Sequence, residues 1–163
     1  MNRINKLYLK MAEFYKGNPW RLQHFVKVHS FAKLIAEQEQ LDEKLRYTLE
    51  AAALVHDIGI KPAEEKYGSS AGPLQEKEGP PVAEAMLKEL GFEQDVIERV
   101  SYLVGHHHTY TNIDGMDYQI LVEADFLVNY YEDKMEKETI RKSIAKMFKT
   151  RTGTEIAETM FLC

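Results

Sequence analysis

Hydrophobic residues recur three and four positions apart along nearly the whole chain, and no segment alternates as a β-strand would. This spacing is typical of amphipathic helices and predicts an all-α fold. The second predicted helix begins near Pro19 and carries its apolar stripe from Phe25 to Ile35. The other predicted helices cover about residues 2–15, 42–56, 79–91, 94–107, 117–131, 136–150 and 154–162.

One long stretch between the third and fourth of these helices lacks helical periodicity. Residues 58–79 are rich in glycine, serine, proline and charged side chains, and Pro80 and Pro81 after them suggest the start of a helix. A loop of that length in a compact domain is typical of a substrate lid, here with residues 68–72 as its tip. The alternative is a disordered crossover.

Length and composition indicate one globular domain and disfavour a polyanion as partner. The 163 residues suffice for a sizeable core, and 44% hydrophobic with 29% charged residues is an ordinary soluble composition. We expect a single domain over residues 1–163, with a core over about 21–130 and C-terminal helices over 136–162. The net charge of −5 makes nucleic acid a poor default partner, although a local cation could still recruit a small phosphorylated molecule.

Cysteine usage and the absence of long apolar runs favour the cytoplasm. Cys163 is the only cysteine, so no intramolecular disulfide can form, which suits a reducing compartment. The N-terminal residues lack the apolar core of a signal peptide, and no stretch approaches the roughly 18 apolar residues of a membrane span. We therefore expect a cytoplasmic protein without a membrane partner. Nothing in the sequence indicates its oligomeric state.

Several ionisable residues lie on the apolar faces of predicted helices. His24, His56, His107 and Asp125 follow apolar residues at helical spacing, and Asp57 comes directly after His56 at a helix end. Burying such groups is costly unless they are paired or bind a metal. Singly, each could be a hydrogen-bonded core residue, or Asp125 could pair with a basic side chain. Together they form a mixed His/Asp set that suits Mn, Fe, Ni, Co or Zn, with Mg as a further possibility.

The order of these residues resembles the H…HD…D signature of the HD-domain metal-dependent phosphohydrolases. The resemblance spans about residues 21–129 and rests on three segments: HFVKV at 24–28, AAALVHDI at 51–58 and VEAD at 122–125. It implies a helical bundle of the HD type in which a divalent metal is held by His24, His56, Asp57 and Asp125. It also implies that Asp57 bridges the metal and a nucleophilic water.

The chain departs from this family at a position that concerns a second metal. Dinuclear members carry a histidine four residues before a glycine that opens the next helix, whereas Gln75 precedes Gly79 here. The second metal could therefore be absent. Its candidate ligands, if it binds, are His106, His107, Glu76 and Glu78. The GYP signature of cyclic-dinucleotide phosphodiesterases and the extra acidic motif of stringent-response hydrolases are not found, so we do not expect those activities.

The resemblance implies hydrolysis of a small phosphate ester by metal-activated water, with a nucleotide as the favoured substrate. The catalytic candidates are Asp57, His107 and His106. His107 has the inward helix position, whereas His108 is expected to start a loop and face solvent. The candidate phosphate contacts are Lys61, Arg21 and Lys66, and each could equally be a solvated surface residue.

Three other functions stay open at this stage. A non-catalytic regulatory module could use the same ligands to bind a metal and a nucleotide without hydrolysis. Oxidative chemistry at a di-iron site is a second alternative, although the missing histidine before Gly79 disfavours it. A purely structural helical protein is the third, and the inward acidic residues disfavour it.

Overall fold

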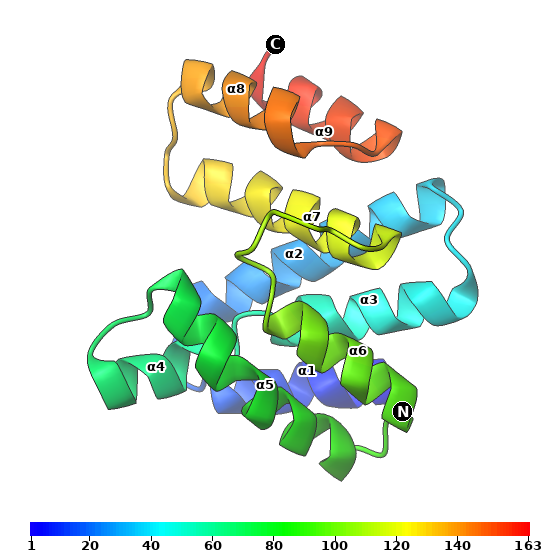
Figure 1. Cartoon of the computed structure of the whole chain (residues 1–163), viewed down its shortest axis with the longest axis vertical. Coiled ribbons are helices and arrows are strands. Elements are labelled where there is room, and N and C mark those ends of the chain that lie inside the picture. Colours follow the sequence, from blue (N-terminus) through cyan, green and yellow to red (C-terminus); the bar gives the residue numbers. More distant parts are fainter.

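The computed structural model describes residues 1–163 and contains nine helices and no strand (Figure 1). This confirms the predicted all-α fold. The helices are α1 (Arg3–Phe14), α2 (Pro19–Gln38), α3 (Glu43–Val55), α4 (Ile60–Tyr67), α5 (Gly72–Glu89), α6 (Gln94–Val104), α7 (Met116–Glu132), α8 (Lys137–Met147) and α9 (Arg151–Phe161). None of them is both long enough and apolar enough to cross a lipid bilayer.

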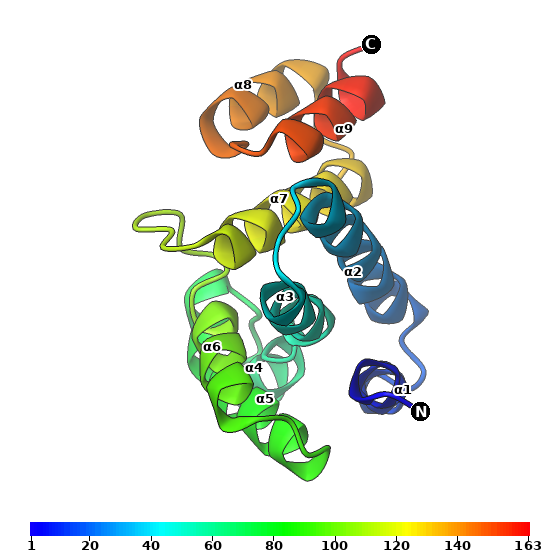
Figure 2. The same ribbon diagram turned by 90° about the vertical axis from the view of Figure 1, so that its right-hand side faces the viewer.

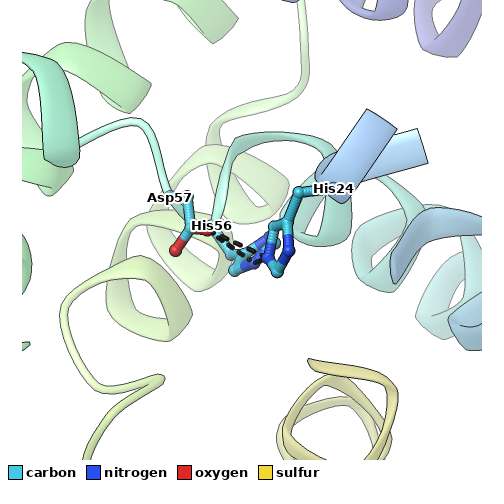
Figure 3. Close-up of side chains that lie close together, drawn as sticks. All are labelled: His24, His56 and Asp57. Atoms are coloured by element: carbon cyan, nitrogen blue, oxygen red, sulfur yellow. Dashed lines mark hydrogen bonds and ion pairs between the residues drawn. The ribbon is translucent and has the colours of Figure 1, made fainter. Parts of the chain in front are cut away.

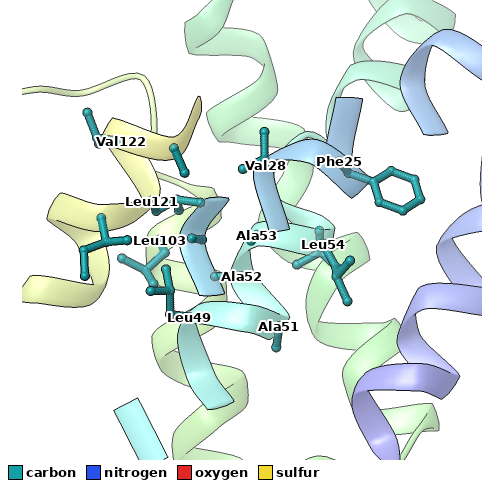
Figure 4. Close-up of a cluster of buried hydrophobic side chains, with 14 of the residues drawn as sticks. Phe25, Val28, Leu49, Ala51, Ala52, Ala53, Leu54, Leu103, Leu121 and Val122 are labelled. Atoms are coloured by element: carbon teal, nitrogen blue, oxygen red, sulfur yellow. The ribbon is translucent and has the colours of Figure 1, made fainter. Parts of the chain in front are cut away.

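Helix α3 lies at the centre of the core, in contact with α1, α2, α6 and α7 (Figure 2). All of its residues from Thr48 to Val55 except Glu50 are buried. The consecutive alanines 51–53 have almost no side-chain volume, which lets neighbouring backbones approach α3 on several sides. Larger side chains from α2, α6 and α7, such as Val28, Leu103 and Leu121, close the core around them (Figure 4).

The prediction of a long irregular segment at residues 58–79 is wrong. Helix α4 occupies its first half, α5 begins at Gly72, and only residues 68–71 join the two helices. Pro80 and Pro81 lie inside α5, whereas Pro73 stands in its first turn. The segment is therefore neither an irregular lid nor a disordered crossover.

Close packing explains why α5 continues through two prolines. A proline removes one helical hydrogen bond and normally ends or kinks a helix. Here Gly59 lies so close to α5 that an added Cβ would collide with the carbonyl oxygen of Gln75 and come within 2.9 Å of the Gly79 nitrogen. On the other side, a Cβ on Gly79 would lie 2.6 Å from a methyl group of Val104 in α6. Tertiary packing thus overrides the local signal.

A buried carboxylate attaches the C-terminal hairpin of α8 and α9 to α7. Glu123 is 0% exposed. Its carboxylate accepts hydrogen bonds from the backbone N–H groups of Lys149 (3.0 Å) and Thr150 (3.1 Å), the Thr150 hydroxyl (2.6 Å) and the Gln119 amide (2.6 Å). These donors include both the N–H and the hydroxyl of Thr150, which caps α9, so Glu123 holds the start of that helix against α7.

Candidate metal centre

Three helices and one turn bring the predicted ligands together. His24 lies on the buried stripe of α2, whose start is capped by the Asn18 side chain accepting from the Arg21 N–H. His56 follows the last residue of α3, and Asp57 comes next in the turn that leads to α4. Asp125 lies in the middle of α7. Figure 3 shows His24 pointing across from α2 toward His56 and Asp57.

The turn that carries His56 and Asp57 is held by hydrogen bonds on both sides. The His56 Nδ1 atom lies 2.7 Å from the carbonyl oxygen of Ala53, one turn earlier in α3. The Tyr15 hydroxyl, from the end of α1, donates to the carbonyl oxygen of Asp57 at 2.8 Å. These contacts direct the His56 Nε2 atom and the Asp57 carboxylate toward α2 and α7.

Between these elements, the Nε2 atoms of His24 and His56 lie side by side and each is close to the carboxylates of Asp57 and Asp125. The His24 Nε2 atom lies 3.3 Å from His56 Nε2, 3.1 Å from Asp57 Oδ2 and 3.2 Å from Asp125 Oδ1. The His56 Nε2 atom lies 3.4 Å from Asp57 Oδ2 and 3.3 Å from Asp125 Oδ1. Ligands that share one first-row ion at about 2.0–2.2 Å are separated from each other by roughly 2.8–3.6 Å. The five separations given above fall in that range.

Burial also fits a bound cation. All four residues are buried, and Asp125 Oδ1 has no hydrogen-bond partner although two imidazole nitrogens lie beside it. Leaving a buried charged oxygen unpaired costs on the order of 1–3 kcal/mol or more. An ion at the common centre would satisfy Asp125, and a set of two imidazoles and two carboxylates suits Mn, Fe, Co, Ni or Zn.

The charges of the four groups reinforce one another. Burial alone would lower the pKa of His24 and His56, but Asp57 and Asp125 raise the pKa of His24 to about 11 and of His56 to about 10. Burial would likewise raise the pKa of both carboxyl groups, but the imidazoles keep it below the usual range. Without an ion, two imidazolium groups thus balance two carboxylates. A divalent cation with two neutral imidazoles gives the same total charge.

A second group of side chains lies on the other side of Asp57. The Asp57 Oδ1 atom is 3.3 Å from the Nε2 atom of His107, which is 1% exposed and has no hydrogen-bond partner at Nε2. His108 is half-buried beside it, which corrects the expectation that His108 faces solvent. Its Nε2 atom lies 2.9 Å from Gln75 Oε1, and the Gln75 amide nitrogen donates to the carbonyl oxygen of Ser70. Burial, together with the charge of His107, lowers the pKa of His108 to about 4.

Comparison with known proteins agrees with this geometry. The family model of the HD domain matches residues 21–152. The chain belongs to the HD domain family. The predicted family and the HD-type fold are thereby confirmed, and the family supports a metal-dependent hydrolase class without identifying a substrate. Within the HD domain, His24, His56, Asp57, His107 and His108 cluster as possible ligands of a divalent metal.

One solved structure extends the comparison. It is the crystal structure of a predicted HD superfamily hydrolase from an uncultured Thermotogales bacterium, with a TM-score of 0.67 and 26% sequence identity. The match covers 95% of this chain and 83% of that one. No curated protein matches the chain.

Several residues predicted for a second metal lie away from the centre of this HD domain. His106 stacks on Tyr102 with ring centroids 4.0 Å apart. The Glu76 carboxylate accepts from the Thr109 hydroxyl and the His108 backbone N–H. Glu78 accepts from the Tyr67 hydroxyl and from Lys66. The geometry therefore gives no support to a metal-binding role of His106, Glu76 or Glu78.

Of the three predicted phosphate contacts, only one lies at the metal centre. Lys61 is exposed and lies over the Phe14 ring at 5.0 Å, and Lys66 pairs with Glu78. Neither residue lines the cleft above the metal centre, whereas Arg21 does.

That cleft has a volume of about 370 Å³. Its walls come from the start of α2, the end of α7 and the region around the α4–α5 turn. They include Trp20, Arg21, Ser70, Gln75, His108, Asn129 and Asp133, beside the ligands His24, Asp57 and Asp125. A neighbouring groove of about 470 Å³ shares Trp20 and Glu132 with the cleft and adds Lys27, Tyr131 and Lys134. A larger hollow of about 850 Å³ between α1, α2, α3 and α6 contains no candidate metal ligand.

Sequence reasoning missed Glu132 and the pairing of Gln75 with His108. Glu132 lies seven residues after Asp125, hence two turns further along the same face of α7. That spacing was a usable signal. No comparable sequence signal indicated the contact between Gln75 and His108, because it joins residues of two different helical regions, 33 positions apart.

Proposed function

We propose that this HD domain is a metal-dependent phosphohydrolase that acts on a small phosphate ester, with a nucleotide as substrate. The observation that carries the proposal is the convergence of ligand atoms of His24, His56 and Asp57, 3.1–3.4 Å apart, at the base of an open cleft, with Asp125 3.2–3.3 Å from both imidazoles. When bound there, a divalent ion lowers the pKa of water and neutralises charge on a phosphoryl group. The relative, a predicted HD superfamily hydrolase, supports the same reaction class.

Asp57 and His107 provide the polar groups around the proposed nucleophilic water. Asp57 has one carboxylate oxygen toward His24 and His56 and the other toward His107 Nε2. The Asp57 carboxylate can therefore accept a hydrogen bond from water on the cleft side, and His107 can orient the carboxylate or exchange a proton with it. The contact between His107 Nε2 and Asp57 supports His107, rather than His106, for that role.

Arg21 is the proposed phosphate contact. It lies one turn before His24 on α2 and is the only lysine or arginine among the residues that line the cleft. A guanidinium group can donate two parallel hydrogen bonds to phosphate oxygens. Its position at the wall of the cleft suits a phosphoryl group that enters above Asp57 and Asp125.

The neighbouring groove supports a nucleotide over a smaller ester. Trp20 is 56% exposed and belongs to both the cleft and the groove, and Tyr131, 71% exposed, lines the groove. Exposed aromatic rings beside a phosphate pocket suit stacking against a planar base. Lys134, in the same groove, adds positive charge for an anionic ligand.

The test is phosphate release from nucleoside monophosphates and from a generic aryl phosphate, with and without Mn²⁺, Co²⁺ or Ni²⁺. We expect metal-dependent turnover by the wild type and loss of at least about 100-fold in Asp57→Ala, because metal and water would lose their shared carboxylate. Circular dichroism should show that the helices persist. Asp95→Asn, an exposed position in the first turn of α6, is the matched control and should keep full turnover.

Two outcomes would overturn the proposal. Retained metal-dependent turnover in Asp57→Ala would show that the chemistry occurs elsewhere. Tight nucleotide binding by the metal-loaded wild type without any phosphate release would instead identify the non-catalytic regulatory module.

A further inference from the structure

Glu132, the last residue of α7, makes a contact with His24 that the proposed reaction does not itself require. Its side chain is only 4% exposed, although the residue stands at a helix end beside the exposed Tyr131. One carboxylate oxygen lies 2.5 Å from His24 Nδ1, and the other lies 2.9 Å from Lys27 Nζ. Glu132 thus contacts the ring nitrogen of His24 that faces away from the metal centre.

This contact determines which nitrogen of His24 carries a proton. An ionised carboxylate can only accept hydrogen bonds, so His24 Nδ1 must donate. The Nε2 atom, which faces His56, Asp57 and Asp125, is then the nitrogen whose lone pair can bind an ion. We infer that Glu132 is a positioning residue that holds His24 in its metal-binding tautomer and ring orientation. The inference concerns metal binding alone and rests on the proposed function only for the identity of the site.

His24 differs in this respect from the other inward histidines. His56 and His107 have their Nδ1 atoms beside neutral carbonyl oxygens, those of Ala53 at 2.7 Å and Val104 at 2.8 Å. Only His24 has a charged acceptor, which makes its Nε2 atom a stronger ligand. The difference follows from local structure. His56 and His107 stand just past the ends of α3 and α6 and can bend back to their own helix, whereas His24 lies inside α2 and needs a partner from α7.

A purely structural role is the competing explanation, because the ion pair between Glu132 and Lys27 also joins α7 to α2. The two roles involve different oxygens of the carboxylate, so they can be separated by substitution. Glu132→Gln removes the charge opposite His24 at nearly constant shape. Lys27→Gln removes the ion pair and leaves the contact with His24 in place, so it serves as the matched control.

The experiment measures the Kd of the full chain for Zn²⁺ and Mn²⁺ by competition with a chromogenic chelator, together with thermal melting. Glu132→Gln should weaken metal binding about 10- to 100-fold, the range typical when a residue that hydrogen-bonds to a metal ligand is replaced. Lys27→Gln should stay within about twofold of the wild type. Equal losses in both variants, or no loss in Glu132→Gln, would assign Glu132 a structural role and overturn the inference.

A measurement on the wild type keeps the inference testable if Glu132→Gln does not fold. Proton NMR of the zinc-loaded protein should show the His24 Nδ1–H shifted downfield and slow to exchange with water, because Glu132 accepts it, and an Nδ1–H that exchanges freely would contradict the inference. These readouts do not depend on turnover. A wild type that binds metal but hydrolyses nothing would refute the proposed function and leave the role of Glu132 intact.

Discussion

At the scale of single residues, Gln75 decides how many ions the centre can hold. Its amide nitrogen donates to the Ser70 carbonyl oxygen, so its amide oxygen faces His108 Nε2 and that nitrogen must carry a proton. A protonated nitrogen offers no lone pair to a metal. The side of Asp57 that faces α6 then retains Asp57 Oδ1, His107 Nε2 and the His108 nitrogen that Gln75 does not contact, Nδ1. Asp57 is shared with the first site, so this second set is weaker than the four ligands of the first.

We therefore expect one divalent ion per chain and the release of about two protons when it binds at pH 7. His24, with a pKa of about 11, and His56, with a pKa of about 10, are both protonated at that pH without an ion, and each must lose a proton to become a ligand. Affinity should consequently rise with pH until the pH approaches 11, the higher of the two pKa values. Isothermal titration calorimetry in buffers of different ionisation enthalpy measures both the stoichiometry and the proton count.

His29→Gln is the control for this titration. His29 pairs with Glu50 outside the centre, so its loss should change neither number. A stoichiometry of two ions, or metal binding without proton release, would show that the ligand set or its charge balance differs from the one inferred.

At the scale of secondary structure, the turn between α3 and α4 depends on a close approach of backbones. Gly59 has an ordinary helical φ of −74°, so it is needed for space and not for conformational freedom. A Cβ at this position would press on backbone atoms of α5, which cannot rotate away as a flexible side chain could. The same approach holds α5 beside the turn that carries Asp57.

Gly59→Ala should therefore lower the free energy of unfolding of the metal-free protein by about 1–3 kcal/mol, the usual cost of overpacking. Urea denaturation monitored by circular dichroism measures the change. Glu65→Ala, an exposed substitution in α4, is the control and should stay within about 0.5 kcal/mol of the wild type. Equal stability of the two variants would mean that α4 and α5 can separate at little cost.

Local sequence determines the positions of most helices but not the contacts between helices that complete the site. Apolar spacing, with Pro19 as the start signal of α2, was sufficient to place α2 and α3, because these signals act within one helix. The prolines of α5 misled the prediction because packing against Gly59 and Val104 outweighs them. The inward position of Asp125 was readable from its own helix. The contact of Glu132 with His24 depends on how α7 crosses α2, which periodicity does not report.

At the scale of the whole molecule, α7 separates two regions with different tasks. Helices α8 and α9 pack on one side of it, and α3 with the metal centre lies on the other (Figures 1 and 2). Asp125 and Glu123 are two residues apart on α7, and they serve the centre and the C-terminal hairpin respectively. A single helix thus connects the stability of the hairpin to the position of a metal ligand.

Glu123→Ala tests whether this connection affects the metal centre. The substitution leaves the N–H groups of Lys149 and Thr150 without their acceptor, and we expect the free energy of unfolding to fall by about 3 kcal/mol. Because α2, α3 and the body of α7 pack together without the hairpin, the Kd for Mn²⁺ should remain within about threefold of the wild-type value. Urea denaturation measures the free energy of unfolding, and chelator competition measures the Kd.

Glu155→Ala, on the exposed face of α9, is the control and should change neither quantity. A loss of metal affinity in proportion to the loss of stability would show that the hairpin also holds Asp125 in place.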